Sequence, residues 1–309
     1  MGHNMRGRSF IGVSDFSNNE LVETVELART LKRNHKAGIL DRPLVGKTLG
    51  VVFQKPSLRT RASFEVAMTH LGGDVVYLSP PEVGMGTREA VDDVAIVLSR
   101  YFDVISARVF EHRIVQDLAA HAAIPVINAL SDGEHPCQAL ADLLTIQEWL
   151  GGLRGVRVTF VGDGNNVAAS LALACAKVGA DFTLACPEGY DLPAAMIDKI
   201  EAERRATGAS FRVVRDPKEG ARGTNVLYTD VWTSMGQEEE QERRLKAFDG
   251  FCIDQELVDL GDDAIVLHCL PAHYGEEITR DVTRGARSAI WDQAENRLHT
   301  AKAVLALLV

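Results

Sequence analysis

Residues 48–73 read TLGVVFQKPSLRTRASFEVAMTHLGG. An apolar run leads into a basic turn, and the turn leads into a helical pattern that ends at two glycines. The run TLGVVF, residues 48–53, has the composition of a buried strand. A strand followed directly by a helix is the first half of a βαβ unit, so this stretch predicts a parallel sheet.

The same alternation continues along the chain in two series. Four strand-like runs occupy residues 48–130 and five more occupy residues 156–271, with helical patterns between them. The segment GGLRG at 151–155 separates the two series, and the apolar run at 301–309 predicts a short final helix. We therefore predict an α/β protein with two doubly wound parallel-sheet domains, whose ligands lie beyond the carboxyl ends of the strands.

Composition narrows the class of protein. The 309 residues carry a formal net charge of −10, which argues against a general nucleic-acid binder. The five cysteines include no CxxC pair, so we expect neither a disulfide framework nor a zinc finger, and we expect a reducing compartment. The N-terminus does not resemble a signal peptide, and no run of about 18 apolar residues occurs. These features predict a cytoplasmic protein without a membrane partner.

The basic turn KPSLRTR, residues 55–61, is a candidate anion site. Ser57 is placed to cap the following helix, whose first N–H groups carry partial positive charge. Arg59 and Arg61 add planar donors that suit phosphate. The alternative is an ordinary helix cap followed by solvated arginines, but the density of donors favours phosphate binding.

Two other strand ends in the first series carry polar residues. His135 and Gln138, in EHPCQ, are spaced to lie on one side of a helical turn, where both side chains can reach one carbonyl oxygen. The alternative is a helix cap with a surface histidine. Arg108 ends an apolar run, which makes it either a rim charge or a ligand clamp.

The second series contains GDGNN at 162–166. Gly162 and Gly164 resemble part of a dinucleotide fingerprint, but Val167 replaces the third glycine, which argues against NAD. The side chains of Asn165 and Asn166 can instead offer amides to a carboxylate. Asp230 ends a later strand-like run and is either a partner for a substrate ammonium group or a helix cap.

Cys269 follows the last strand-like run, in VLHCLPAH. A nucleophilic cysteine needs a paired base, and the neighbouring His268 points the opposite way if both lie on a strand. We therefore interpret Cys269 as a residue that lines the site.

Together these motifs resemble the aspartate/ornithine carbamoyltransferase family along nearly the whole chain. FQKPSLRTR at 53–61 is similar to the family's carbamoyl-phosphate motif, and HPCQ at 135–138 to its second motif. DVWTSMGQEEE at 230–240, HCLPA at 268–272 and AENR at 294–297 are similar to the ornithine branch in particular. The aspartate branch usually lacks SMG and HCLP.

The resemblance implies two α/β domains with the active site in the cleft between them. A carbamoyl-phosphate-binding domain would cover residues 1–149, with the C-terminal helix 297–309 packed on it, and an ornithine-binding domain would cover 150–296. The resemblance also implies a homotrimer or a multiple of trimers. The loop SPPEVGMGTRE, residues 79–89, of a neighbouring copy would then complete each site.

The implied activity is transfer of the carbamoyl group of carbamoyl phosphate to the δ-amine of L-ornithine, giving L-citrulline and phosphate without a metal or cofactor. The catalytic residues would be Arg59, Arg108, His135 and Cys269. Carbamoyl phosphate would be bound by Ser57, Leu58, Arg59, Thr60, Gly84, Arg108, His135, Pro136, Cys137, Gln138, Cys269, Leu270 and Arg297. Ornithine would be bound by Asn166, Asp230, Ser234 and Met235.

Two positions depart from the family pattern. Leu58 stands where threonine is commonest, and Gly84 stands where many relatives carry glutamine.

Three alternative functions stay open. The first is a carbamoyltransferase with another acceptor, namely aspartate, putrescine or an N-acylated ornithine. The others are an NAD-dependent dehydrogenase and a binding protein without catalytic activity. The sequence does not separate arginine synthesis from breakdown, because the chemistry is the same.

Overall fold

The computed structural model describes residues 4–233 and 240–309. The chain forms two compact units: unit 1 is Met1–Leu144 with Glu295–Val309, and unit 2 is Thr145–Ala294. Each unit contains a parallel sheet flanked by helices, which confirms the predicted fold class. The domain limits taken from the sequence, 149/150 and 296/297, stay a prediction.

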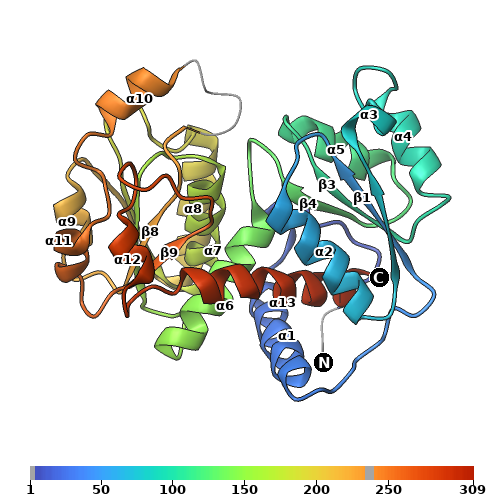
Figure 1. Cartoon of the computed structure of the whole chain (residues 1–309), viewed down its shortest axis with the longest axis horizontal. Helices are drawn as coiled ribbons and strands as arrows, with labels where there is room; N and C mark the ends of the chain where they lie inside the picture. Colours follow the sequence, from blue (N-terminus) through green and yellow to red (C-terminus); the bar gives the residue numbers. More distant parts are fainter. Residues whose placement is uncertain (1–3, 234–239) are drawn as a thin grey trace. The chain divides into compact units, whose positions relative to one another are not determined.

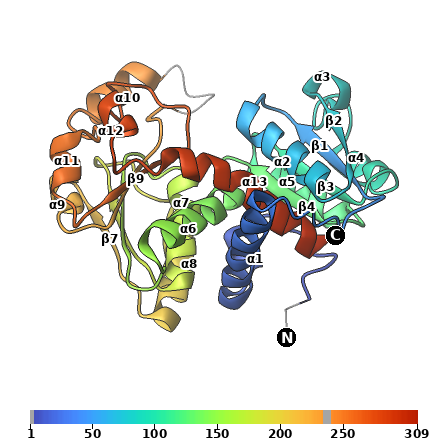
Figure 2. The same ribbon diagram turned by 60° about the horizontal axis from the view of Figure 1, so that its bottom comes forward.

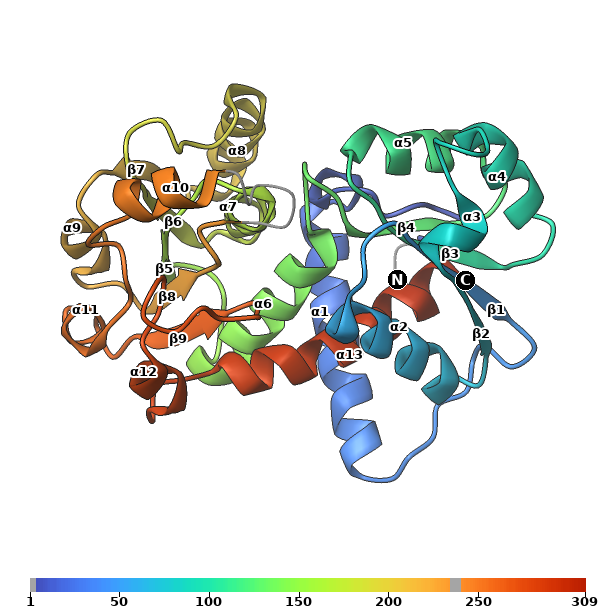
Figure 3. The same ribbon diagram turned by 45° about the horizontal axis from the view of Figure 1, so that its top comes forward.

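Unit 1 is built on a four-stranded parallel sheet with the order β2-β1-β3-β4 (Figure 3). Its strands are β1 Thr48–Phe53, β2 Asp74–Leu78, β3 Val104–Arg108 and β4 Val126–Leu130. The register places Phe53 beside Arg108, so the carboxyl ends of β1 and β3 lie next to each other.

Helices cover both faces of this sheet, as expected for a sheet whose strands are almost entirely apolar. They are α1 Asn18–Lys36, α2 Leu58–His70, α3 Pro80–Val83, α4 Val91–Leu98, α5 His112–His121, the first part of α6 Pro136–Leu150 and the second part of α13 Ile290–Leu308. Helices α4 and α5 lie on one face, and α2 and α13 lie on the other (Figure 3). Helix α1 lies beside α13 (Figure 2), where the Lys32 Nζ donates to the Asn296 Oδ1 at 2.7 Å.

Unit 2 is built on a five-stranded parallel sheet with the order β7-β6-β5-β8-β9. Its strands are β5 Arg157–Val161, β6 Asp181–Ala185, β7 Phe211–Val214, β8 Val226–Thr229 and β9 Ile265–His268. Its helices, besides the remaining parts of α6 and α13, are α7 Asn166–Val178, α8 Ala194–Thr207, α9 Pro217–Ala221, α10 Gln241–Ala247, α11 Gln255–Asp259 and α12 Arg280–Arg284.

The sheet of unit 2 is also covered on both faces (Figure 1). Helices α7 and α8 pack on one face. On the other face, Ala221 of α9 and Leu257 of α11 join a buried apolar cluster with Val161, Leu227 and Val266 of the strands. The helices on this face are short, and the apolar cluster rather than helix length holds them in place.

Each sheet has one point where the strand order reverses. In unit 1 the chain runs from β1 outward to β2 and then returns to β3 on the other side of β1. In unit 2 it runs from β5 through β6 and β7 and returns to β8 on the other side of β5. Ligands of open α/β sheets bind at such points. The residues that follow β1, β3, β5 and β8 are therefore the first place to look for a site.

Two of the longest helices differ from the sequence prediction. Helix α1 was not predicted, although Ser17 and Glu20 form a capping box at its start. Helix α13 begins at Ile290, well before the short helix predicted at 301–309. The prediction missed its first half because the side chains buried there are polar and leave no apolar pattern in the sequence. Within the residues that the structure describes, no helix has both the length and the apolar content needed to span a bilayer.

His299 of α13 gives unit 1 a dependence on pH. Burial lowers the pKa of His299 from 6.5 to about 4, and the hydrogen bond that Glu295 accepts from the ring opposes this shift only in part. The folded state therefore favours neutral His299, so its contribution to stability is complete above pH 6.5 and is lost as the pH falls towards 4.

We expect the free energy of unfolding to fall by up to about 3 kcal/mol across this window because of His299. Urea titrations at pH 7 and pH 4.5 give the free energy of unfolding at each pH. The slope of this free energy against pH should be smaller in the His299→Gln variant than in the wild type. His121, exposed on α5, supplies the matched control, because His121→Gln should leave the slope unchanged. Equal slopes in the wild type and His299→Gln would contradict the assignment.

Candidate functional site

The N-terminus of α2, which follows the end of β1, is the candidate anion site. Ser57 caps the helix, with its hydroxyl accepting the Thr60 N–H at 3.3 Å. Leu58 and Arg59 are the first residues of the helix, where backbone N–H groups have no partner within the helix. Their N–H groups and the partial positive charge of the helix end favour an anion such as phosphate.

The two arginines of this turn have different environments. The Arg61 Nε donates to the Glu65 Oε1 at 2.7 Å, and its guanidinium carbon lies 3.7 Å from the centre of the Tyr77 ring. Its hydrogen bond to Glu65 raises the pKa of Arg61. Arg59 is half-buried and makes no ion pair with any residue that the structure describes. Of the two arginines suggested by the sequence, Arg59 is therefore the one available to an anion.

A buried polar group lies next to this helix end. The Thr60 hydroxyl accepts a hydrogen bond from the Arg297 Nη2 at 2.9 Å and another from the Arg108 Nη1 at 3.2 Å. The Arg297 Nη1 also donates to the Gln138 Oε1 at 3.0 Å, and the Gln138 Nε2 donates to the Asp142 Oδ1 at 2.8 Å. Two cationic side chains are thus held in an almost dry position, which is costly unless a bound anion or a network of this kind compensates them.

The segment His135–Gln138 contributes from the start of α6, where Pro136 is the first helical residue. Burial lowers the pKa of His135 well below 6.5, and the charges of Arg297 and Arg108 lower it further. His135 is therefore neutral at pH 7. Burial raises the pKa of the Cys137 thiol to about 12, and this thiol contacts the Asn128 carbonyl oxygen at 3.4 Å.

The two departures from the family pattern have different settings. The Leu58 side chain is 81% exposed, so it contributes no packing to the helix end. Gly84, in the turn after α3, has a φ of 57°. A side chain there would place its Cβ only 2.7 Å from the Arg88 Cβ. The turn therefore favours glycine over the glutamine of many relatives.

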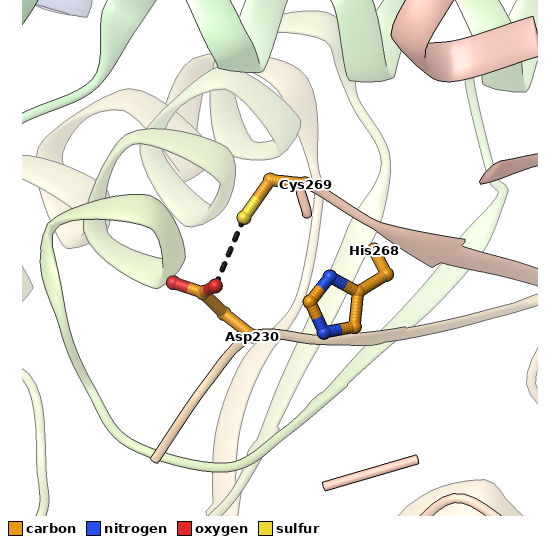
Figure 4. Close-up of side chains that lie close together, drawn as sticks. All are labelled: Asp230, His268 and Cys269. Atoms are coloured by element: carbon orange, nitrogen blue, oxygen red, sulfur yellow. Dashed lines mark hydrogen bonds between the residues drawn. The ribbon is translucent and has the colours of Figure 1, made fainter. Parts of the chain in front are cut away.

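A second polar group forms in unit 2, at the ends of β8 and β9. The Cys269 thiol donates to the Asp230 Oδ1 at 3.0 Å (Figure 4). The Asn165 Nδ2 donates to the Asp230 Oδ2 at 2.9 Å, while the Asn165 Oδ1 caps α7 by accepting the N–H groups of Val167 and Ala168. Asp230 is buried, and its two oxygen atoms are held by two different elements.

Asn165 is a residue whose place in the site the sequence analysis left open. The sequence assigned ornithine contact to Asn166, which is the first residue of α7. The structure places Asn165 against Asp230, because the N-cap position directs its side chain across the helix end. The contact of Asn166 with ornithine stays a prediction. Ser234 and Met235 lie outside the described residues.

His268 lies closer to Cys269 than strand alternation predicts. One ring nitrogen of His268, the Cys269 Sγ and one Asp230 carboxylate oxygen all lie within 4.8 Å of one another (Figure 4). The prediction that the two side chains point apart is wrong, because β9 ends at His268 and Cys269 already belongs to the following loop. The Cys269 thiol nevertheless bonds to Asp230, and His268 contacts Glu277 and Leu270.

These three residues offer the atom types of a metal site, as does a second group of His273, Glu276 and Glu277. In the first group, hydrogen bonds already engage the thiol, the carboxylate and both ring nitrogens. The arrangement is that of a hydrogen-bonded network. The sequence prediction of a site without metal stays a prediction.

Unit 2 also contains an ion pair that the sequence analysis missed. The Arg244 Nη1 lies 2.7 Å from the Asp163 Oδ2 and donates to the Trp232 carbonyl oxygen at 2.9 Å. Taken as sequence alone, the charged run EEEQERR at 238–244 predicts a solvated helix face. Residues 238–239 lie outside the described residues. The prediction is wrong for Arg244, whose side chain is 8% exposed because it pairs with Asp163 after β5.

Comparisons with known proteins identify relatives along almost the full length. Residues 8–148 match the family model of the aspartate/ornithine carbamoyltransferase, carbamoyl-P binding domain. Residues 154–308 match that of the aspartate/ornithine carbamoyltransferase, Asp/Orn binding domain. The chain is 53% identical over 304 residues to the ornithine carbamoyltransferase of Acidothermus cellulolyticus, covering 98% of this chain and 96% of that protein. It is 50% identical over 306 residues to that of Pyrococcus abyssi, covering 99% and 96%.

Solved structures agree with the sequence comparison. The ornithine carbamoyltransferase of Pyrococcus furiosus superposes with a TM-score of 0.96 at 49% identity, covering 99% of this chain and 98% of that chain. The anabolic ornithine carbamoyltransferase of Campylobacter jejuni superposes with a TM-score of 0.92 at 36% identity, covering 96% and 97%.

Proposed function

The chain belongs to the aspartate/ornithine carbamoyltransferase family, and we propose that it transfers the carbamoyl group of carbamoyl phosphate to the δ-amine of L-ornithine, giving L-citrulline and phosphate. One observation carries the proposal: a buried hydroxyl held between two guanidinium groups adjoins an open helix N-terminus. The names of relatives at about half identity support ornithine as the acceptor.

Unit 1 binds carbamoyl phosphate in this proposal. The phosphate lies at the α2 N-terminus against Ser57, the N–H of Leu58, Arg59 and Thr60. The carbamoyl group lies against Arg108, His135 and Gln138. We also propose contacts with this substrate from Gly84, Pro136, Cys137, Cys269, Leu270 and Arg297.

Unit 2 binds ornithine. The buried Asp230 carboxylate accepts hydrogen bonds from the α-ammonium group, and the amide of Asn166 binds the α-carboxylate. Asn165 and Cys269 fix the orientation of Asp230, so the carboxylate does not have to reorganise when the substrate arrives. Ser234 and Met235 complete this set in the proposal.

The chemistry follows from these positions. The neutral δ-nitrogen forms a bond to the carbonyl carbon, and the bond from that carbon to the phosphate oxygen breaks. The Thr60 hydroxyl accepts two N–H groups, so its own hydrogen is free to be donated to the carbonyl oxygen on which charge develops. His135, being neutral, can donate from one ring nitrogen. The departing phosphate accepts the proton that the amine loses.

An acceptor assay tests the proposal directly. Radiolabelled carbamoyl phosphate is offered with ornithine, aspartate, putrescine or N-acetylornithine in separate reactions. The expected result is label in citrulline and none in the other products. If the label appeared in the product of another amine, that amine would be the acceptor. If no product were labelled in any reaction, the proposal would be contradicted.

Replacing Thr60 by valine removes the shared acceptor while keeping the shape of the side chain. We expect kcat to fall about 10²-fold, because one fixed donor is lost and two guanidinium groups then face a methyl group. Thr69, exposed on the same helix with its hydroxyl bonded to the Glu65 carbonyl oxygen, supplies the control. Steady-state kinetics of Thr60→Val and Thr69→Val should differ by that factor, and equal kcat values would contradict the role of Thr60.

We further propose a homotrimer, or a multiple of trimers, in the cytoplasm. The resemblance of the loop 79–89 to a family loop that reaches a neighbouring copy supports this assembly. Sedimentation velocity at micromolar concentration would distinguish a trimer from a monomer.

A further inference from the structure

A fully buried imidazole–carboxylate pair lies beneath the Cys269–Leu270 loop of unit 2. The His268 Nε2 lies 3.0 Å from the Glu277 Oε1, and both side chains have 0% exposure. His268 is the last residue of β9 and lies beside Thr229 of β8 in the sheet register. Burying a carboxylate has a high desolvation free energy, which hydrogen bonds to the carboxylate have to offset.

The two ring nitrogens of His268 have opposite roles. The Nδ1 accepts the Leu270 N–H at 2.8 Å, so it carries no proton. The Nε2 therefore carries the hydrogen and donates it to Glu277. The same Glu277 oxygen accepts the His273 N–H at 2.6 Å. One imidazole and one carboxylate thus hold the backbone on both sides of residues 271–272.

The held backbone includes a residue in an unfavourable conformation. Leu270 has a φ of 60°, in the left-handed region that is unfavourable for a residue other than glycine. Its N–H is held by the His268 ring, and the preceding Cys269 is directed at Asp230. Without the acceptor on Nδ1, Leu270 can relax towards ordinary backbone angles and turn Cys269 away from Asp230.

We propose that His268 and Glu277 are positioning residues, which do not touch substrate but hold Cys269 and Leu270 in place and thereby orient Asp230 for ornithine. The inference rests on the proposed function for its kinetic consequences. Its structural core is independent of the substrate: removing the Nδ1 acceptor or its carboxylate partner releases the Cys269 thiol from the Asp230 carboxylate.

Two substitutions separate the two nitrogens. The amide oxygen of asparagine occupies a place similar to Nδ1, so His268→Asn keeps an acceptor for the Leu270 N–H. The amide nitrogen of glutamine occupies a place similar to Nε2, so His268→Gln keeps only the donor to Glu277. A role confined to filling the core predicts equal effects of the two variants, whereas positioning predicts that asparagine restores more function.

Two neighbouring carboxylates give a matched comparison. Glu277→Leu removes the partner of His268 and of the His273 N–H. Glu276→Leu removes a carboxylate whose oxygen lies 3.6 Å from the His273 Nδ1 and whose side chain is 30% exposed. Only the first substitution should affect the loop.

Kinetics with both substrates varied give the first measurement. We expect His268→Gln and Glu277→Leu to lower kcat/KM for ornithine about 10-fold or more, as is typical when the supports of site residues are removed. The KM for carbamoyl phosphate should change much less, because most of the residues proposed to bind that substrate lie in unit 1 and do not depend on this loop. His268→Asn should recover most of the loss, and Glu276→Leu should match the wild type. Equal changes in both KM values, accompanied by equal losses of melting temperature, would overturn the inference in favour of a purely structural role.

Alkylation of the Cys269 thiol by iodoacetamide, followed by mass spectrometry of its peptide, gives a measurement that does not need activity. Glutathione added to each reaction serves as the reference thiol. Burial and the charge of Glu277 both contribute to the raised pKa of the half-buried Cys252, which rules that residue out as an internal reference. Labelling of Cys269 relative to glutathione should be faster in His268→Gln and Glu277→Leu than in the wild type, His268→Asn and Glu276→Leu. Equal labelling in all five proteins would overturn the inference. A wild type that does not carbamoylate ornithine would instead reject the proposed function, and the labelling comparison would still decide the positioning role.

Discussion

Replacing Arg59 with alanine is expected to abolish detectable carbamoyl transfer, with a loss of at least about 10²-fold in kcat/KM, while the protein stays folded. Arg59 sits in the first turn of α2, at the open N–H groups of the helix, and no residue in the described part of the chain forms an ion pair with it. Its charge therefore contributes little to the fold. In the proposed reaction that charge stabilises the leaving phosphate, whose negative charge grows as the carbon–oxygen bond breaks.

Arg61 provides the matched control for this experiment. It lies two residues further along the same turn, but its guanidinium group is bonded to Glu65 and lies over the Tyr77 ring. Arg61→Ala should retain most of the activity, because its loss removes surface contacts and no phosphate ligand. Thermal unfolding in the presence of inorganic phosphate completes the test, since phosphate should raise the melting temperature of the wild type and Arg61→Ala but not of Arg59→Ala. An active Arg59→Ala enzyme would refute the assignment of the phosphate site.

The sequence predicted the strands and the helix capped by Ser57, because both depend on local patterns. TLGVVF, for example, forms β1 over the predicted residues 48–53, since a short β-branched run between turn residues has few other structures open to it. Helix α13 was harder to predict. Its first half buries Gln293, Asn296 and Arg297, and polar residues at these positions hide the apolar face that identifies a buried helix.

The sequence suggested residue types for the candidate site, but it could not show which contacts these residues make. The sequence offered Arg59 and Arg61 equally, and only the neighbours Glu65 and Tyr77 separate them. The sequence likewise could not show that Asn165 holds Asp230, because that contact joins two strand ends more than sixty residues apart. The backbone role of His268 depends on the end of β9 falling at that residue, and strand ends are the least reliable part of a sequence prediction.

Replacing Asp230 with asparagine should raise the KM for ornithine about 10–100-fold and leave the KM for carbamoyl phosphate unchanged. Both Asp230 oxygens accept hydrogen bonds, one from the Cys269 thiol and one from the Asn165 amide. An asparagine side chain has one oxygen and one NH₂ group, so its NH₂ must face one of these donors. The substitution therefore removes the charge that the ornithine ammonium group needs and disturbs one of the contacts that orient residue 230.

Bisubstrate kinetics of Asp230→Asn separate this effect from a general loss of structure. Asp191, which forms a partly exposed ion pair with Arg215, supplies the control, and Asp191→Asn should leave both KM values unchanged. A surface ion pair contributes at most about 1 kcal/mol, so this control should also keep its melting temperature within a few degrees. If Asp230→Asn raised both KM values by the same factor, the carboxylate would be a structural support for the whole site. A selective rise for ornithine is the result that a direct contact between the Asp230 carboxylate and the ammonium group requires.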